Sequence, residues 1–245
     1  MSARIEATNV HQVLVAAKTS VPRRHSGIIR RPRLTSRLAA GADLPLVVVS
    51  APVGYGKTTL LVDWLQHDDR AVAWVSLDRA DDDVATLMTS IIAGVKRVRE
   101  LDPSLSQELV SPDVSVLGRV VPGLAASIGA VDEPLVVVLD HLDEIRSLDC
   151  QDALRLLLDL LPESVQLVVS SRREVWLAGG RRRVRGEVLE IGATDLVFDA
   201  TEVEELLEVH GVAPSPDRVR QLLERTEGWP AGLALLSPTY RGDSA

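Results

Sequence analysis

The fold is decided by the stretch Leu46-Val47-Val48-Val49-Ser50-Ala51-Pro52-Val53-Gly54-Tyr55-Gly56-Lys57-Thr58-Thr59-Leu60. It opens with a continuous apolar run, which is typical of a strand in a parallel sheet that is covered on both faces. Two glycines then indicate a tight loop. The apolar residues after the loop recur at the spacing of one helical face: Leu60, Leu61, Trp64 and Leu65. The stretch therefore predicts a buried strand, a glycine loop and a helix that opens on Lys57.

The loop follows the pattern G-x-x-x-x-G-K-[ST], with Ala51 in place of the first glycine. Gly54 and Gly56 allow the backbone to curl so that successive N–H groups point inward and bind phosphate oxygens, next to the positive end of the following helix. Lys57 would reach the β- and γ-phosphates, and the Thr58 hydroxyl would ligate Mg²⁺. The residues expected to bind nucleotide here are Ala51, Pro52, Val53, Gly54, Tyr55, Gly56, Lys57, Thr58 and Thr59.

A second motif lies about 80 residues further on. The apolar run 135–139 ends in Asp140, and an acid at such a strand end lies beside the phosphate-loop threonine, where it holds Mg²⁺ directly or through water. Asp143 and Glu144 follow closely enough to orient or deprotonate an attacking water. Arg172 follows another apolar run, 165–170, and is expected to point toward the γ-phosphate. The catalytic candidates are Lys57, Asp140, Asp143, Glu144 and Arg172, and the metal ligands are Thr58 and Asp140.

Apolar runs alternate with helical patterns along the chain, and the predicted strands are 46–50, 71–77, 135–139, 165–170 and 188–191. This alternation predicts an α/β protein: a P-loop NTPase with a five-stranded, mainly parallel, doubly wound sheet, followed by a small helical lid. Expected helices include 34–38, a stretch from 112 to 130 interrupted by Pro122, and 152–161. The acidic residues 81–83 are expected to start a helix rather than to bind a metal.

The lid is predicted from cap signals. Thr201 and Glu204 match the capping-box pattern, Gly211 is expected to end that helix, and Ser215-Pro216 to begin the next one. Gly228-Trp229-Pro230 then breaks the chain before a last short helix. A helix-turn-helix could also be drawn here, but the acidic face at 202–208 argues against docking in a DNA groove.

Composition limits the function classes. The net charge of −8 and the pI near 5.2 make direct DNA binding by this segment unexpected. The single cysteine, Cys150, excludes an internal disulfide and a Cys-rich zinc site, and no apolar run is long enough for a membrane span, so we expect a cytoplasmic location. The basic run 181–185 is interpreted as a solvated loop or as arginines leaning toward the phosphates. A guanine-reading Asn-Lys-x-Asp motif is excluded because the only asparagine is Asn9, and adenine is therefore favoured.

Five tracts, in order, resemble the MalT-type regulators, which are signal-transducing ATPases of the STAND class with a LuxR-type DNA-binding domain. They are the phosphate loop 50–60 and the stretches 29–34, 74–78, 185–191 and 224–233. The resemblance implies a module that binds ATP or ADP with Mg²⁺, closed and monomeric with ADP and opened by ATP and an inducer for self-association, with slow hydrolysis resetting it. It also implies that Pro230 touches the adenine from the lid and that Ile28 and Ile29 line the base pocket.

The expected organisation is a flexible tail (1–20), a nucleotide-binding domain (21–195) and a helical lid (196–245). The winged-helix, repeat-sensor and DNA-binding domains of the family have no counterpart in the sequence, which would make it either a fragment or a truncated relative. Asp140-His141 stands where many members have two adjacent acids, so the water-activating role could pass to Asp143 or Glu144. A non-hydrolysing module that acts by association with homologous regulators, and a small-molecule kinase, are the competing readings.

Overall fold

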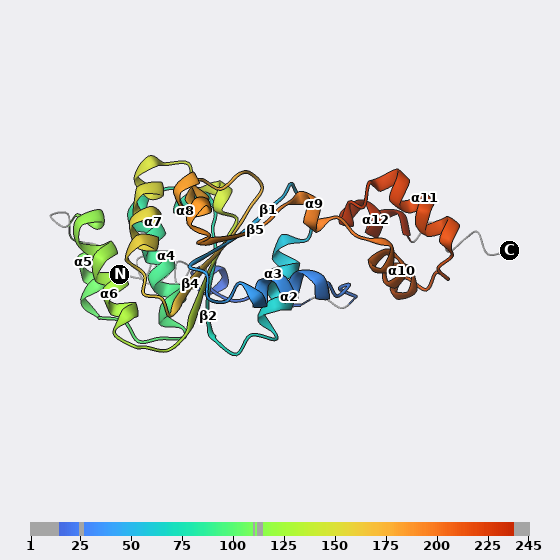
Figure 1. Cartoon of the computed structure of the whole chain (residues 1–245). Helices are drawn as coiled ribbons and strands as arrows, with labels where there is room; N and C mark the ends of the chain where they lie inside the picture. Colours follow the sequence, from blue (N-terminus) through green and yellow to red (C-terminus); the bar gives the residue numbers. More distant parts are fainter. Residues whose placement is uncertain (1–14, 25–26, 110, 112–114, 238–245) are drawn as a thin grey trace, which may run out of the picture.

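Five parallel strands form the centre of the molecule, in the order β2-β3-β4-β1-β5 (Figure 1). The computed structural model describes residues 15–24, 27–109, 111 and 115–237. The strands are β1 (Leu46–Ser50), β2 (Ala71–Ser76), β3 (Leu135–Asp140), β4 (Val165–Ser171) and β5 (Val188–Ile191). All four strand pairings are parallel, so the carboxyl ends of the strands lie at one edge.

Both faces of the sheet are buried because the strands are apolar at successive positions, not at alternate ones. One face packs against α4 (Val84–Lys96), α6 (Val121–Gly129) and α7 (Leu148–Leu160). The other face packs against α2 (Pro32–Ala40) and α3 (Lys57–Leu65). Neighbouring residues divide between the two cores, as in β3, where Val137 faces the first and Val138 the second. The predicted doubly wound sheet is thus confirmed, and every strand pairing in it is parallel.

The remaining elements connect or extend this body. Short helical turns are η1 (Arg79–Asp81), η2 (Val116–Val120), η3 (Leu142–Glu144) and η4 (Trp176–Ala178). Further helices are α5 (Ser104–Glu108), α8 (Gly180–Arg185) and α9 (Ala193–Leu196). Last come α10 (Ala200–Val209), α11 (Pro216–Thr226) and α12 (Pro230–Leu236), which pack around a separate small core at one end of the molecule, joined by Ile29 (Figure 1).

Several helix boundaries differ from those expected from the sequence. Helix α7 begins at Leu148, four residues before the predicted start at Asp152. Pro122 does not interrupt a helix, since it lies in the first turn of α6, where its missing N–H is not needed. Residues 112–114 of that predicted stretch lie outside the described residues.

The lid helices begin and end close to the predicted cap signals, with one correction. The capping box of α10 is formed by Asp199 and Glu202, two residues before the predicted Thr201 and Glu204. Ser215 caps α11 through a hydrogen bond from the Arg218 N–H, as the Ser-Pro pattern predicts.

The basic run 181–185 is part of an exposed helix, α8, and not a loop. Three of its arginines pair with nearby acids and not with the phosphate loop: Arg182 with Asp159 and Glu187, Arg183 with Glu174 and Glu190, and Arg185 with Glu187. None of the described helices is long and apolar enough to cross a membrane.

The three adjacent aspartates after β2 point to different partners. Asp81 is fully buried and accepts hydrogen bonds from Ser90 and Lys18. Asp82 accepts from the backbone N–H groups of residues 146 and 147, and Asp83 caps α4. This cluster supports loop and helix geometry, and no group of three or more metal-binding side chains occurs among the residues that the structure describes.

Replacing Asp83 with alanine is expected to lower the free energy of unfolding by about 1 kcal/mol at pH 7, because the Thr86 N–H loses its acceptor. The bonds from Thr86 hold the pKa of Asp83 below its usual 3.8, so its stabilising contribution is present above that pH and is lost as the pH falls further. Urea unfolding at pH 7 and pH 3 should therefore give a smaller difference at pH 3. Asp132→Ala, in an exposed turn, is the control and should change neither value.

Candidate nucleotide-binding site

The loop between β1 and α3 has the backbone conformation that a phosphate cradle requires. Gly54 and Gly56 have φ angles of 86° and 77°, in the left-handed region that favours glycine. Gly56 is the residue immediately before α3, so the first N–H groups of that helix face the loop. These φ angles agree with the tight glycine loop that the sequence predicts.

Lys57 lies folded against its own loop. Its side-chain nitrogen donates to the carbonyl oxygens of Ala51 at 2.6 Å and Pro52 at 3.0 Å, and the residue is only 8% exposed. Burial lowers the pKa of Lys57, while the nearby carboxylates of Asp143 and Asp140 oppose that shift. A cationic nitrogen is therefore held at the centre of the loop by weak, neutral acceptors, which a phosphate oxygen can replace.

Thr58 and Asp140 meet at the carboxyl edge of the sheet. The Thr58 hydroxyl donates to Asp140 Oδ2 at 2.9 Å, although the two residues are 82 positions apart. The buried Asp140 also accepts a hydrogen bond from the Ser170 hydroxyl of β4. A hydroxyl and a carboxylate at hydrogen-bonding distance supply the hard oxygen ligands that Mg²⁺ prefers, so the residues present fit this ion.

Ser170 was not expected from the sequence. It lies in the strand next to Asp140 and also accepts a hydrogen bond from the His141 N–H at 3.2 Å. His141 itself has a φ of 64°, and its ring Nδ1 is 3.7 Å from Asp140 Oδ2. The one usable signal was a serine near the carboxyl end of a buried strand.

The other predicted catalytic residues surround this pair. Asp143 accepts a hydrogen bond from the Arg172 backbone N–H at 2.9 Å, and the Arg172 Nε lies 3.7 Å from its other oxygen. Glu144 turns outward toward Arg79, whose Nε is 4.0 Å away. The structure thus brings Asp143 and Arg172 together near Lys57, and leaves Glu144 at the periphery.

The lid contacts the phosphate loop directly. The Ala231 N–H at the start of α12 donates to the Gly54 carbonyl at 3.0 Å, and the Trp229 ring nitrogen donates to the Val53 carbonyl at 3.3 Å. A Cβ atom at Gly54 would lie 2.7 Å from the Trp229 ring nitrogen and 2.8 Å from the Ala231 Cβ. A glycine at position 54 therefore allows the positive φ angle of the loop and also leaves room for Trp229 and Ala231 of the lid.

The variant Gly54→Ala is expected to destabilise the closed lid much more than Gly56→Ala. Both substitutions place a side chain at positive φ, which costs roughly 1 kcal/mol. Only the alanine at 54 also collides with the lid, because nothing lies within 4 Å of a Cβ at Gly56. Hydrogen exchange of the α12 amides in nucleotide-free protein should accelerate in Gly54→Ala, while equal rates in the two variants would contradict the packing role.

A cavity of about 230 Å³ lies between α3, the segment 27–31 and the lid. Its walls include the three residues that the family resemblance assigns to base binding, namely Ile28, Ile29 and Pro230. Gly56 and Thr59 border the same cavity, so it opens beside the phosphate loop. The cavity is mostly apolar, as a planar base would require.

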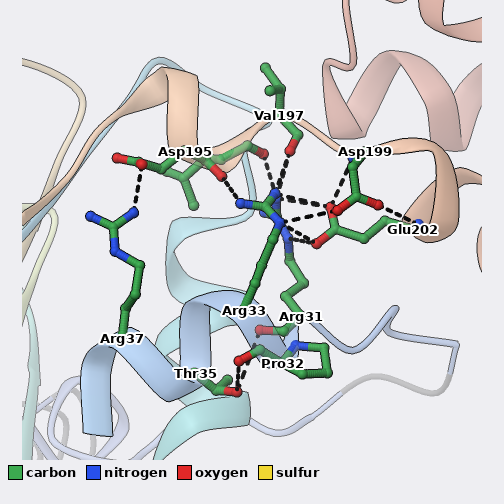
Figure 2. A network of polar contacts seen from close by, with 10 residues as sticks. Arg31, Pro32, Arg33, Thr35, Arg37, Asp195, Val197, Asp199 and Glu202 are labelled. Atoms are coloured by element: carbon green, nitrogen blue, oxygen red, sulfur yellow. Dashed lines mark hydrogen bonds and ion pairs between the residues drawn. The ribbon is translucent and has the colours of Figure 1, made fainter. Parts of the chain in front are cut away.

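A network of arginines and acids connects the start of α2 to α10 and to residues 196–199, which lead into α10 and which we call the hinge of the lid (Figure 2). The Arg31 guanidinium donates to both carboxylate oxygens of Glu202 at 3.2 Å and to the carbonyls of Leu196 and Val197 at 2.9 Å. Arg31 also stacks on the Phe198 ring at 4.9 Å and is only 6% exposed. Arg33 adds bonds to Glu202. Burial lowers the pKa of Arg31, against the opposing effect of Glu202.

Sequence reasoning did not predict this network. The Arg-Arg-Pro-Arg stretch supplied only a basic segment, and its acidic partners lie more than 150 residues away. Asp195, paired with Arg37 at 2.5 Å, belongs to the same set (Figure 2).

Comparisons with the sequences and structures of known proteins support the P-loop fold. No family model matches the chain. It is 33% identical over 233 residues to the serine/threonine-protein kinase PknK of Mycobacterium tuberculosis, covering 92% of this chain and 20% of that protein. It is 28% identical over 235 residues to the HTH-type transcriptional regulator MalT of Klebsiella pneumoniae, covering 95% of this chain and 26% of the regulator. The chain therefore spans about a fifth to a quarter of these relatives.

The solved structure of the Walker-type ATPase PAby2304 of Pyrococcus abyssi has the same fold. It aligns with a TM-score of 0.58 and 14% identity, over 91% of this chain and 70% of that one. With the parallel sheet, the glycine loop and the Thr58–Asp140 contact, this likeness confirms the predicted P-loop fold. The chain is a P-loop NTPase-type α/β protein that is homologous, over nearly its whole length, to part of the MalT-type regulators.

Proposed function

We propose that the chain is the ATP/ADP-binding switch module of a signal-transducing transcriptional regulator. The observation that carries this proposal is the hydrogen bond from the lid's Ala231 N–H to the Gly54 carbonyl of the phosphate loop. Any ligand that binds in the loop changes the surface on which the lid rests. Lid position and nucleotide state are therefore coupled, which is the requirement for a two-state switch.

The residues divide the work of binding. The N–H groups of the loop and the Lys57 nitrogen bind the phosphates, and the cavity bordered by Ile28, Ile29 and Pro230 receives the adenine. Thr58 and Asp140 would hold Mg²⁺, which neutralises phosphate charge when bound. Ser170 keeps the Asp140 carboxylate turned toward Thr58 through its hydroxyl hydrogen bond.

Hydrolysis is assigned to the residues at the edge of the sheet. Asp143 orients a water molecule and accepts its proton, while Arg172 stabilises charge on the γ-phosphate oxygens. In the structure the Asp143 carboxylate accepts the Arg172 N–H and lies beside the Arg172 Nε, so it must leave this pairing to take up a water molecule. This prior step supports slow turnover, and Glu144 is the alternative base.

The switch is proposed to act through association in the cytoplasm. With ADP the lid stays closed and the module is monomeric, and with ATP it opens and associates with itself or with homologous regulators. The similarity to MalT, a transcriptional regulator by name, supports this setting. The organisation into a domain at 21–195 and a lid at 196–245 is part of the proposal, and no direct DNA contact is assigned to this segment.

Phosphate release from ATP with Mg²⁺ tests the hydrolytic part. We expect slow, steady turnover that falls at least about a hundredfold in Asp140→Asn, because a neutral carboxamide replaces the anionic oxygen that would hold Mg²⁺ beside Thr58. Asp159→Asn, in the last turn of α7 where the side chain pairs with Arg182, is the matched control and should retain full activity. Binding of ATP without any turnover in the unaltered chain would favour a non-hydrolysing module instead.

Sedimentation velocity with ADP, and with a non-hydrolysable ATP analogue, tests the switching part. The proposal predicts a monomer with ADP and a larger species with the ATP analogue. Identical sedimentation in both states would contradict coupling between nucleotide and association.

A further inference from the structure

A buried carboxylate borders the cavity between α3 and the lid. Asp63 lies in α3, after the phosphate-loop residues Lys57 and Thr58, and is only 5% exposed. It lines the cavity of about 230 Å³ together with Ile29, Leu60 and Pro230. An acid in such an apolar wall needs a reason, because burying one without partners is costly.

The negative charge of Asp63 is balanced by an arginine, but one of its carboxylate oxygens lacks a hydrogen bond. Its Oδ1 lies 3.0 Å from the Arg24 Nη2, which forms an ion pair with it. Even so, Oδ1 is buried and accepts no hydrogen bond from any residue that the structure describes. Buried acceptors are nearly always bonded, so this oxygen has an acceptor position available for a ligand.

The other residues that line the cavity limit which chemical groups of a ligand could bind beside Asp63. Among the described residues that line it, Asp63 has the only carboxylate. The Nε and Nη2 donors of Arg31, on the same wall, are already directed at Glu202 and at the carbonyls of Leu196 and Val197. The cavity therefore offers apolar surface for a flat ring and one anionic acceptor for an N–H group at its edge.

We propose that Asp63 reads the base of the nucleotide by accepting a hydrogen bond from the 6-amino group of adenine. This inference rests on the proposed function, which places the phosphates at Lys57 and the base in the cavity. A 6-oxo purine would turn a carbonyl oxygen toward the same carboxylate, so two acceptors would face each other in a buried site. A site built to bond an N–H group rejects an analogue without it far more strongly than an apolar pocket does.

Calorimetric titration with ADP, inosine diphosphate and 2′-deoxy-ADP tests the assignment. We expect the unaltered chain to prefer ADP over inosine diphosphate by at least about tenfold. In Asp63→Asn that ratio should fall toward one, because a carboxamide can accept from an amino group or donate to a carbonyl. Asp69→Asn, an exposed aspartate in the loop after α3, is the matched control and should keep the original ratio.

A second variant, Arg24→Gln, distinguishes loss of base recognition from loss of folding caused by breaking the buried ion pair. Arg24→Gln removes the charge partner but leaves the carboxylate, so the preference for ADP should persist. Loss of the preference in Arg24→Gln, or an unchanged ratio in folded Asp63→Asn, would overturn the inference. So would a change confined to the ratio of ADP to 2′-deoxy-ADP, which would place Asp63 at the ribose. If the unaltered chain bound ADP and inosine diphosphate equally, only the base assignment would fail, whereas no binding of either would overturn the proposed function as well.

Discussion

Replacing Lys57 with alanine is expected to lower the affinity for ATP and ADP about a hundredfold, equivalent to about 2.7 kcal/mol. Lys57 is the cationic side chain that the loop encloses, and among the described residues its nitrogen is hydrogen-bonded only to the neutral carbonyls of Ala51 and Pro52. A phosphate oxygen makes a charge-assisted bond with this nitrogen that alanine cannot replace. Fluorescence titration with a labelled ADP measures the effect.

The thermal stability of the nucleotide-free protein separates this effect from misfolding. Lys57→Ala removes two hydrogen bonds but also removes a buried charge, so the melting temperature should change little. Lys96→Ala is the matched control, since Lys96 is exposed on α4 and bonds only to Ser106 among the described residues. Wild-type affinity in Lys57→Ala would mean that nucleotide does not bind in this loop.

Replacing Arg31 with alanine is expected to lower the free energy of unfolding by about 3 kcal/mol. Arg31 and Glu202 are both buried, with side-chain exposures of 7% and 6%, and removing one partner leaves the other insufficiently compensated. The hinge carbonyls of Leu196 and Val197 lose a donor as well. Because Arg33 still reaches Glu202, we expect the lower end of the range known for broken buried pairs.

Urea unfolding of Arg31→Ala, Glu202→Ala and the double variant measures this contribution. The combined loss should be smaller than the sum of the single losses, because either substitution breaks the same pair. Arg30→Ala is the matched control, as Arg30 is the adjacent exposed arginine. Additive losses in the double variant would show that the two residues do not stabilise the hinge together.

The sheet could be predicted from the sequence because its strands are mostly apolar runs that alternate with helical patterns. The first strand leads into the glycine loop and the third ends in Asp140, and parallel strands bring these ends to one edge. That topology places Thr58 and Asp140 at the same edge, although β4 lies between their strands, so it indicates that they are near each other but not that they are hydrogen-bonded. Arg172 could be placed near the site for the same reason.

What could not be predicted depends on contacts between distant segments. Nothing near Arg31 indicates that Glu202 is its partner, and nothing in α3 distinguishes Asp63 from an ordinary surface acid of an amphipathic helix. The docking of Ala231 on Gly54 depends on how the lid folds back, which is a tertiary property. Helix starts such as those of α7 and α10 were shifted because several nearby residues could serve as caps, and packing selects among them.

The most direct test of the central claim is calorimetric titration of ADP into nucleotide-free protein, after any co-purified nucleotide has been removed by partial unfolding and identified. We predict one ADP bound per chain and co-purified ADP in the untreated sample. We also predict that accelerated hydrogen exchange of α12 returns to slow exchange when ADP is restored. Failure to bind ADP in a folded chain would contradict the account, since the phosphate loop, the cavity and the lid would then have no common ligand.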